Sequence, residues 1–122
     1  MPGNARLGRW GERLAARHLE AQGFTILARN FRFHRNEIDL VARRGPLVVF
    51  VEVKARAGPG FGHPLEAVTR AKRREIERVA RAWVQSHGRP GDDYRFDAIA
   101  IERGTGGRPA LAHVEGAWRA GE

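Results

Sequence analysis

The sequence predicts a mixed α/β domain in which a five-stranded sheet is flanked by helices. Two observations lead to this class. Apolar residues recur at helical spacing in residues 7–22 and 69–87, and five short runs rich in apolar residues occupy the rest. The resulting order is helix, three strands, helix, two strands. With 122 residues, the chain fits one domain, and we expect its core over about 7–115 with flexible ends.

The first helix is predicted over residues 7–22. Leu7, Trp10, Leu14 and His18 fall on one face at helical spacing, and Gly23 is a natural stop. Three β-like pieces follow, at 24–29, 37–43 and 47–54. The link at 44–46 is short enough to make the last two a hairpin.

A second helix is predicted from about Thr69, as its N-cap, to Ser86 or His87, with Gly88 just past its end. Before it, residues 55–64 are rich in glycine and proline, which predicts a flexible loop containing His63.

Two further strands are predicted after the second helix, at 94–102 and 110–115. We expect the chain to fray from about Gly116, and Trp118 could pack on a neighbouring subunit.

Composition limits the classes of function. A net charge of +8 and a pI of about 11.4 indicate a polyanionic partner, and nucleic acid fits better than a membrane surface. The absence of cysteine excludes disulfides and thiolate metal sites, so a bound metal would be a hard ion such as Mg²⁺ or Mn²⁺. Residues 1–10 have no apolar secretory core, which predicts a cytoplasmic protein.

Lysine is rare: of the 22 basic residues, only Lys54 and Lys72 are lysines. Lys54 ends the tripeptide Glu52-Val53-Lys54 after an apolar run, and Asp39 lies on the preceding predicted strand. Strand alternation places Glu52 and Lys54 about 7 Å apart on one face. It also places Glu37, Asp39 and Val41 on one face and Ile38, Leu40 and Ala42 on the other.

If Asp39 shares the face of Glu52 and Lys54, two carboxylates and an ammonium converge as in a metal-dependent phosphodiesterase. Asp39, Glu52 and the Val53 carbonyl would hold one or two divalent ions. Lys54 would position the attacking water or neutralise charge on the phosphate. The alternative is a surface salt bridge between Lys54 and Asp39 or Glu52.

Several motifs in order resemble the YraN family of small bacterial proteins over about residues 8–102. They are Gly11-Glu12, residues 23–32, Glu37-Ile38-Asp39-Leu40, residues 49–56 and Arg95-Phe96-Asp97. The resemblance implies the restriction-endonuclease-like fold with its PD-(D/E)xK signature, and similarity to archaeal Holliday-junction resolvases. Ile38 stands where the signature has proline.

The resemblance implies roles for particular residues. Asp39 matches the aspartate of the signature, Glu52 its second acid and Lys54 its lysine. Glu12 matches an acid of the first helix, and so a further catalytic residue and metal ligand. Lys72 matches a basic helix position in the same group, from which it could reach the scissile phosphate. Resolvase-like relatives also imply a homodimer.

Each supporting residue has a plainer interpretation. Glu12 could pair with Arg9 or Arg13, and Lys72 could extend from the core to solvent. Asp97 is expected to be structural, pairing with Lys72 or an arginine. A phosphate-binding surface is predicted at Arg29, Arg32, Arg35 and Arg56, although these could be solvated residues.

The leading hypothesis is therefore a Mg²⁺- or Mn²⁺-dependent nuclease that acts on DNA, more than on RNA, and on branched or structured DNA in particular. The alternatives are a non-catalytic nucleic-acid-binding protein that retains the nuclease fold and, more remotely, a protein–protein adaptor.

Overall fold

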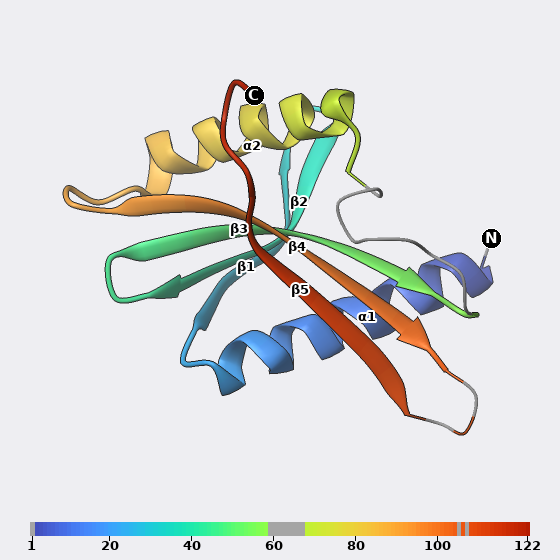
Figure 1. Cartoon of the computed structure of the whole chain (residues 1–122). Helices are drawn as coiled ribbons and strands as arrows, with labels where there is room; N and C mark the ends of the chain where they lie inside the picture. Colours follow the sequence, from blue (N-terminus) through green and yellow to red (C-terminus); the bar gives the residue numbers. More distant parts are fainter. Residues whose placement is uncertain (1, 59–67, 105, 107) are drawn as a thin grey trace.

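The computed structural model describes residues 2–58, 68–104, 106 and 108–122 (Figure 1). The elements confirm the predicted class and order. They are α1 (Pro2–Ala21), β1 (Thr25–Phe33), β2 (Asn36–Arg44), β3 (Leu47–Arg56), α2 (Arg70–His87), β4 (Asp93–Arg103) and β5 (Pro109–Trp118). Within the described ranges, neither helix combines the length and the apolar character that crossing a bilayer requires.

The five strands form one mixed sheet in the order β1-β2-β3-β4-β5. Neighbouring strands are antiparallel except for β3 and β4, which are parallel because the chain crosses back through α2. The two helices cover opposite faces of the sheet, so that the molecule has three layers (Figure 1).

The ends of α2 lie where the sequence predicts them. Thr69 has an extended backbone, and its hydroxyl accepts a hydrogen bond from the Lys72 N–H at 3.2 Å. At the other end, the Gly88 N–H donates to the Val84 carbonyl. A Cβ on Gly88 would lie 2.7 Å from the Tyr94 hydroxyl, so this close approach requires glycine.

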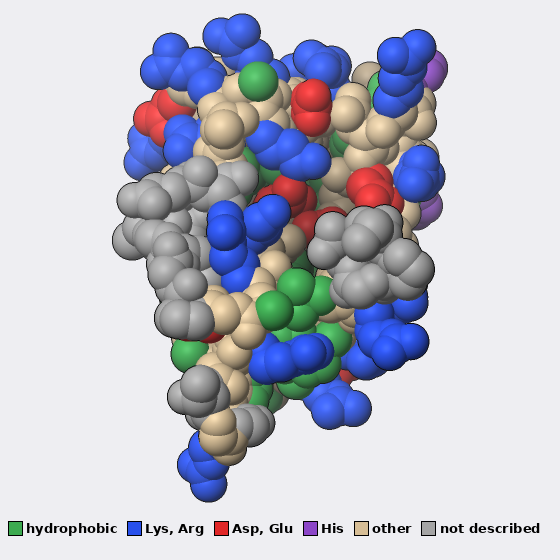
Figure 2. All heavy atoms as spheres, turned by 90° about the vertical axis from the view of Figure 1, so that its right-hand side faces the viewer, with side chains coloured by type: hydrophobic (Ala, Val, Ile, Leu, Met, Phe, Trp, Pro, Cys, Tyr) green, Lys and Arg blue, Asp and Glu red, His purple; other side chains and the backbone are tan. Residues whose placement is uncertain are grey.

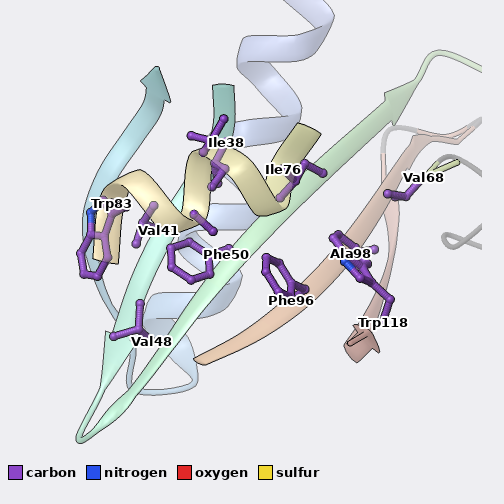
Figure 3. Packing of buried hydrophobic residues seen from close by; sticks show 12 residues of the cluster. Ile38, Val41, Val48, Phe50, Val68, Ile76, Trp83, Phe96, Ala98 and Trp118 are labelled. Carbon is purple, nitrogen blue, oxygen red and sulfur yellow. The ribbon is translucent and has the colours of Figure 1, made fainter. Parts of the chain in front are cut away.

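The core between α2 and the sheet is built around aromatic rings. Phe50 of β3 lies edge-on to Trp83 of α2 and against Phe96 of β4, with ring centroids 5.7 and 5.6 Å away (Figure 3). The cluster continues to Trp118 of β5, which stacks on Phe96 at 5.0 Å.

The core between α1 and the sheet is built from smaller side chains. Ala15, Ala16 and Leu19 of α1 pack on Leu40, Ala42 and on valines and isoleucines of β3 and β4. Gly11 allows α1 to lie directly on β3, because a Cβ there would be 2.7 Å from that of Ala55. The next residue on α1, Glu12, reaches β1, where its carboxylate accepts a hydrogen bond from Asn30.

Several predicted boundaries are wrong. β1 continues to Phe33, and Ala55 and Arg56 belong to β3 and not to a loop. β5 continues to Trp118, which is 4% exposed and packs within its own chain, so the chain does not fray from Gly116 and this tryptophan is not left for a partner. His63 and most of the predicted loop lie outside the described residues.

Candidate active site

The candidate site lies where β2 and β3 separate. These strands pair from Arg44 with Leu47 to Leu40 with Val51, and the pairing stops there. Beyond this point β3 stays paired with β4 while β2 stays paired with β1. Asp39 and Glu52 are the first residues past the last pair, so both carboxylates stand in the fork between the strands.

The Asp39 carboxylate replaces a missing backbone partner. Its Oδ2 accepts a hydrogen bond from the Val53 N–H at 2.7 Å. This contact orients the aspartate toward β3, where Glu52 is the first residue past the last β2–β3 pair. Both predicted acids are therefore together, and Val53 lies beside them.

The electrostatics of the fork favour a bound cation or proton. Burial and the neighbouring charge of Glu52 raise the pKa of Asp39 to about 8. Burial also raises the pKa of Glu52, although the neighbouring Asp39 carboxyl and the charge of Lys72 oppose the rise. Two neighbouring carboxyl groups do not both ionise readily at neutral pH unless a positive charge binds beside them.

The ammonium group at the fork belongs to Lys72, not to Lys54. Lys72 Nζ lies 3.6 Å from Glu52 Oε2, which links the first turn of α2 to β3. Lys54 is exposed and, in the part of the chain that the structure describes, forms no ion pair with Asp39 or Glu52. The structure therefore does not support the alternative interpretation, a salt bridge with Lys54, and a role for Lys54 toward a substrate stays a prediction.

Glu12 reaches the fork from α1. Its carboxylate accepts a hydrogen bond from the Asn30 side-chain amide at 3.3 Å. Among the described residues, Glu12 forms no ion pair with Arg9 or Arg13. Burial, followed by the charge of Asp39, raises the pKa of Glu12, while Arg29 lowers it. Glu12 therefore belongs electrostatically to the same group of acids.

Strand alternation fails next to Asp39. Ile38 packs in the α2-side core together with Val41, although the sequence predicts it on the opposite face with Leu40 and Ala42. Across the ladder, Asn30 has a left-handed backbone with φ 50°, so the irregularity affects both strands. Alternation assumes extended backbone throughout, and here it is interrupted on both strands.

The fork lacks a third close ligand. Over residues 2–58, 68–104, 106 and 108–122, no group of three or more His, Asp or Glu side chains could by itself hold a metal ion. The donor set that remains is the Asp39 and Glu52 carboxylates with the Val53 carbonyl. These are hard oxygen ligands, which suit Mg²⁺ or Mn²⁺ when water completes the coordination shell.

Basic residues surround the acids. Figure 2 shows acidic side chains in the middle of one face, with Lys and Arg side chains on several sides of them. Arg29, Arg35 and Arg56 are exposed, while Arg32 Nε lies 3.8 Å from Glu37, and phosphate binding by these arginines stays a prediction. A hollow of about 350 Å³ beside the fork is lined by Leu7, Gly8, Val53, Lys54 and Ala55.

Asp97 is structural, as predicted, and pairs with an arginine. It is fully buried, and its carboxylate accepts hydrogen bonds from Arg95 at 2.8 and 2.9 Å and from the Gly116 N–H at 3.0 Å. His113 Nε2 lies 2.8 Å from it, and His113 Nδ1 lies 3.0 Å from His18 Nε2 of α1. Helical spacing places His18 on the inner face of α1, whereas no sequence pattern predicts its contact with His113.

The fold and this acidic fork define an α/β protein with a carboxylate site at the edge of a central strand pair. Residues 11–101 match the model of the uncharacterised protein family UPF0102, which corresponds to the YraN family, and the chain belongs to it.

Relatives in this family match between 78% and 97% of the chain. A UPF0102 protein of Chlorobaculum tepidum is 54% identical over 95 residues, covering 78% of this chain and 74% of the relative. One of Rhodococcus jostii is 46% identical over 118 residues, covering 97% of this chain and 100% of the relative. One of Beutenbergia cavernae is 44% identical over 110 residues, covering 90% and 93%.

Proposed function

We propose that this protein is a nuclease of the PD-(D/E)xK type that hydrolyses phosphodiester bonds in DNA and uses Mg²⁺ or Mn²⁺. The observation that carries the proposal is the pair of carboxylates in the fork: Asp39 is held by the Val53 N–H, and Glu52, beside it on β3, lies 3.6 Å from the Lys72 ammonium. Two neighbouring half-buried carboxylates repel each other, and a bound positive charge relieves this repulsion. A divalent cation is the ligand that such a pair fits.

Each residue of the fork has a distinct role in this proposal. Asp39, held by the Val53 N–H, and Glu52 bind the cation together with the Val53 carbonyl. When bound, the cation would polarise the phosphodiester and lower the pKa of a coordinated water.

The lysines and Glu12 act around this centre. Lys72 neutralises Glu52 and stands close enough to contact an approaching phosphate. Lys54, exposed on the same strand, positions the attacking water or compensates charge on the phosphate. Glu12 orients water at the edge of the fork, beside Asp39.

Substrate binding would use the exposed arginines. Arg29, Arg35 and Arg56, with Arg32 when released from Glu37, contact phosphates and do not read bases. Because the charge is spread over the surface, we propose a structured or branched DNA substrate. Symmetrical cleavage of two strands would need a homodimer, which size-exclusion chromatography with light scattering measures.

A cleavage panel tests the nuclease proposal. Single-stranded, duplex, flap and four-way-junction DNA are incubated with Mg²⁺, Mn²⁺ or EDTA. We expect wild type to cleave only with metal, Glu52→Gln to lose cleavage, and Glu20→Gln on the exposed side of α1 to keep it. Cleavage by an Asp39→Ala/Glu52→Ala double variant equal to that of wild type would contradict the proposal.

A second function is favoured by one observation, which is that no three acidic or histidine side chains of the described residues gather into a metal site. In this case the protein binds nucleic acid without cutting it. Salt-sensitive DNA binding by wild type, with no cleavage in any metal and no effect of Glu52→Gln on affinity, would select it.

A further inference from the structure

We infer that Asn30 is the positioning residue of the acidic fork: its left-handed backbone frees Asp39 from both faces of the sheet, and its amide holds Glu12 beside Asp39. This inference deepens the proposed function and rests on it for its catalytic meaning. The placement itself can be tested without cleavage.

The backbone of Asn30 is the first part of the argument. Arg29 pairs with Leu40 and Phe31 with Ile38, so Asn30 lies opposite Asp39 across the β1–β2 ladder. With φ 50°, it is one of two residues other than glycine that have positive φ in the described chain, the other being His34 in the β1–β2 turn. Asn adopts this conformation more readily than most residues.

The consequence of that backbone is visible on both strands. Ala28 and Phe31 contact the α2-side core although they are three residues apart, a spacing that strict alternation assigns to opposite faces. Ile38 and Val41, on the other strand, show the same exchange. Both strands thus change faces at the positions of Asn30 and Asp39. The Asp39 side chain joins neither core and lies in the fork.

The amide of Asn30 is the second part of the argument. Its Nδ2 donates to Glu12 Oε2 at 3.3 Å, across the gap between β1 and α1. The negative charges of Asp39 and Glu37 repel the Glu12 carboxylate and raise its pKa. The amide donor opposes this repulsion, so one residue sets the position of two carboxylates that come from different elements.

Two substitutions separate these two effects. Asn30→Gly keeps a backbone that accepts positive φ and removes only the amide, whereas Asn30→Val also disfavours the left-handed backbone. His34→Gly is the matched control, because it relieves the other positive φ at the distal turn. The carboxyl ¹³C resonances of Glu12 and Asp39 in the metal-free proteins report both positions.

We expect Asn30→Gly to shift the Glu12 resonance and leave that of Asp39, Asn30→Val to shift both, and His34→Gly to shift neither. Unchanged Glu12 and Asp39 resonances in both Asn30 variants would overturn the inference. If Asn30→Val does not fold, the Asn30→Gly result decides the placement of Glu12, and an unchanged Glu12 resonance overturns it.

Metal binding and cleavage then test the role in function. We expect Asn30→Gly to reduce the affinity for Mn²⁺, measured by calorimetry, or the cleavage rate by about 10–100-fold. In a Glu12→Gln background the same change should cost almost nothing, since the amide acts through Glu12. If the fold-losses of Asn30→Gly and Glu12→Gln multiply in the double variant, Asn30 acts independently of Glu12 and its role is structural.

The two proposals fail in different ways. Wild type that neither binds Mn²⁺ nor cleaves DNA contradicts the proposed nuclease, while the resonances still decide whether Asn30 places Glu12 and Asp39. Cleavage by wild type that Asn30→Gly leaves unchanged contradicts the positioning role alone.

Discussion

Gly11 of α1 lies so close to Ala55 of β3 that a Cβ on the glycine would be 2.7 Å from the Cβ of the alanine. Neither atom has a rotatable bond that could relieve such a contact. The distance between α1 and β3 therefore depends on the absence of a side chain at residue 11, and Glu12 follows directly on the same helix.

Gly11→Ala should consequently move α1 away from β3 and displace Glu12 from the fork. We expect a lower melting temperature and a loss of metal-dependent cleavage, measured on the same preparation. Gly8→Ala is the control, because a Cβ there would meet nothing within 4 Å. It should stabilise the helix by up to about 1 kcal/mol. Equal behaviour of the two variants would contradict this account of the packing.

The acidic fork should make the metal-free protein less stable than its own variants. The folded pKa of Asp39, about 8, lies above its ordinary value of 3.8. Its contribution to stability is therefore complete below pH 3.8 and is lost as the pH rises through about 8.

The Asp39→Asn variant keeps a side-chain oxygen for the Val53 N–H and has no group that titrates there, so it should be more stable than wild type at pH 8 in EDTA. We expect a difference of several degrees in melting temperature, at roughly 4 °C per kcal/mol. Adding Mn²⁺ should raise the melting temperature of wild type only. A variant that is less stable at pH 8 would contradict the prediction.

The buried network around Asp97 should control stability in acid. Burial raises the pKa of Asp97, but hydrogen bonds from His113, Arg95 and the Gly116 N–H outweigh it, and the pKa lies below 3.8. Burial and the neighbouring His113 lower the pKa of His18 from 6.5. Both groups therefore stabilise the fold above their ordinary values, and this stability is lost as the pH falls, first for His18 below 6.5.

Thermal unfolding as a function of pH measures this loss. His18→Gln should flatten the decline that begins below pH 6.5. Asp97→Asn should cost about 3 kcal/mol at pH 7, because it leaves Arg95 and His113 without their buried acceptor. The exposed Asp93→Asn serves as the control and should change little. A steep decline that survives His18→Gln would assign the acid sensitivity to other groups.

Trp118 should hold the last strand in place. Its indole N–H donates to Glu77 Oε2 of α2 at 3.1 Å, and its ring stacks on Phe96. Trp118→Ala should cost about 3–5 kcal/mol in urea unfolding. Trp118→Phe keeps an aromatic ring on Phe96 and should cost about 1 kcal/mol. Similar losses in the two variants would show that the hydrogen bond, and not the stacking, holds β5.

The exposed arginines next to the fork should carry a larger share of DNA binding than arginines elsewhere. Replacing Arg29, Arg32, Arg35 and Arg56 with glutamine should reduce the slope of log K against log salt by about 0.9 for each lost contact with duplex DNA. The control replaces four exposed arginines on the outward side of α2 and after it, with the same loss of charge: Arg74, Arg78, Arg81 and Arg89. Equal slopes would assign binding to net charge alone.

Local signals were sufficient for much of the fold. A polar N-cap at Thr69, a helical apolar stripe and Gly88 defined α2 to within a residue of its observed ends. Phe50 and Glu52, two residues apart on β3, both lie on the α2 side of the sheet, as alternation requires. The same rule failed at Ile38, because it cannot detect a single left-handed residue on the neighbouring strand.

The candidate site was predictable in part for the same reason. Asp39 and Glu52 lie on adjacent strands that a short hairpin joins, so their meeting follows from local pairing. The contact between Glu52 and Lys72 joins a strand to a helix that no short turn connects, and spacing alone favoured Lys54. Tertiary packing decided which lysine reached the acid.

The single parallel pairing in the sheet also bears on the order in which the molecule folds. β1, β2 and β3 pair with their neighbours in sequence, whereas Leu47 must find Asp93 far along the chain. Contacts between distant residues form slowly because a long loop has to close first. We expect the three-stranded meander to form early and the β4–β5 hairpin to dock late. Asp39 and Glu52 would then come together while water still reaches them. The desolvation cost of their carboxylates would arise only in the last step of folding.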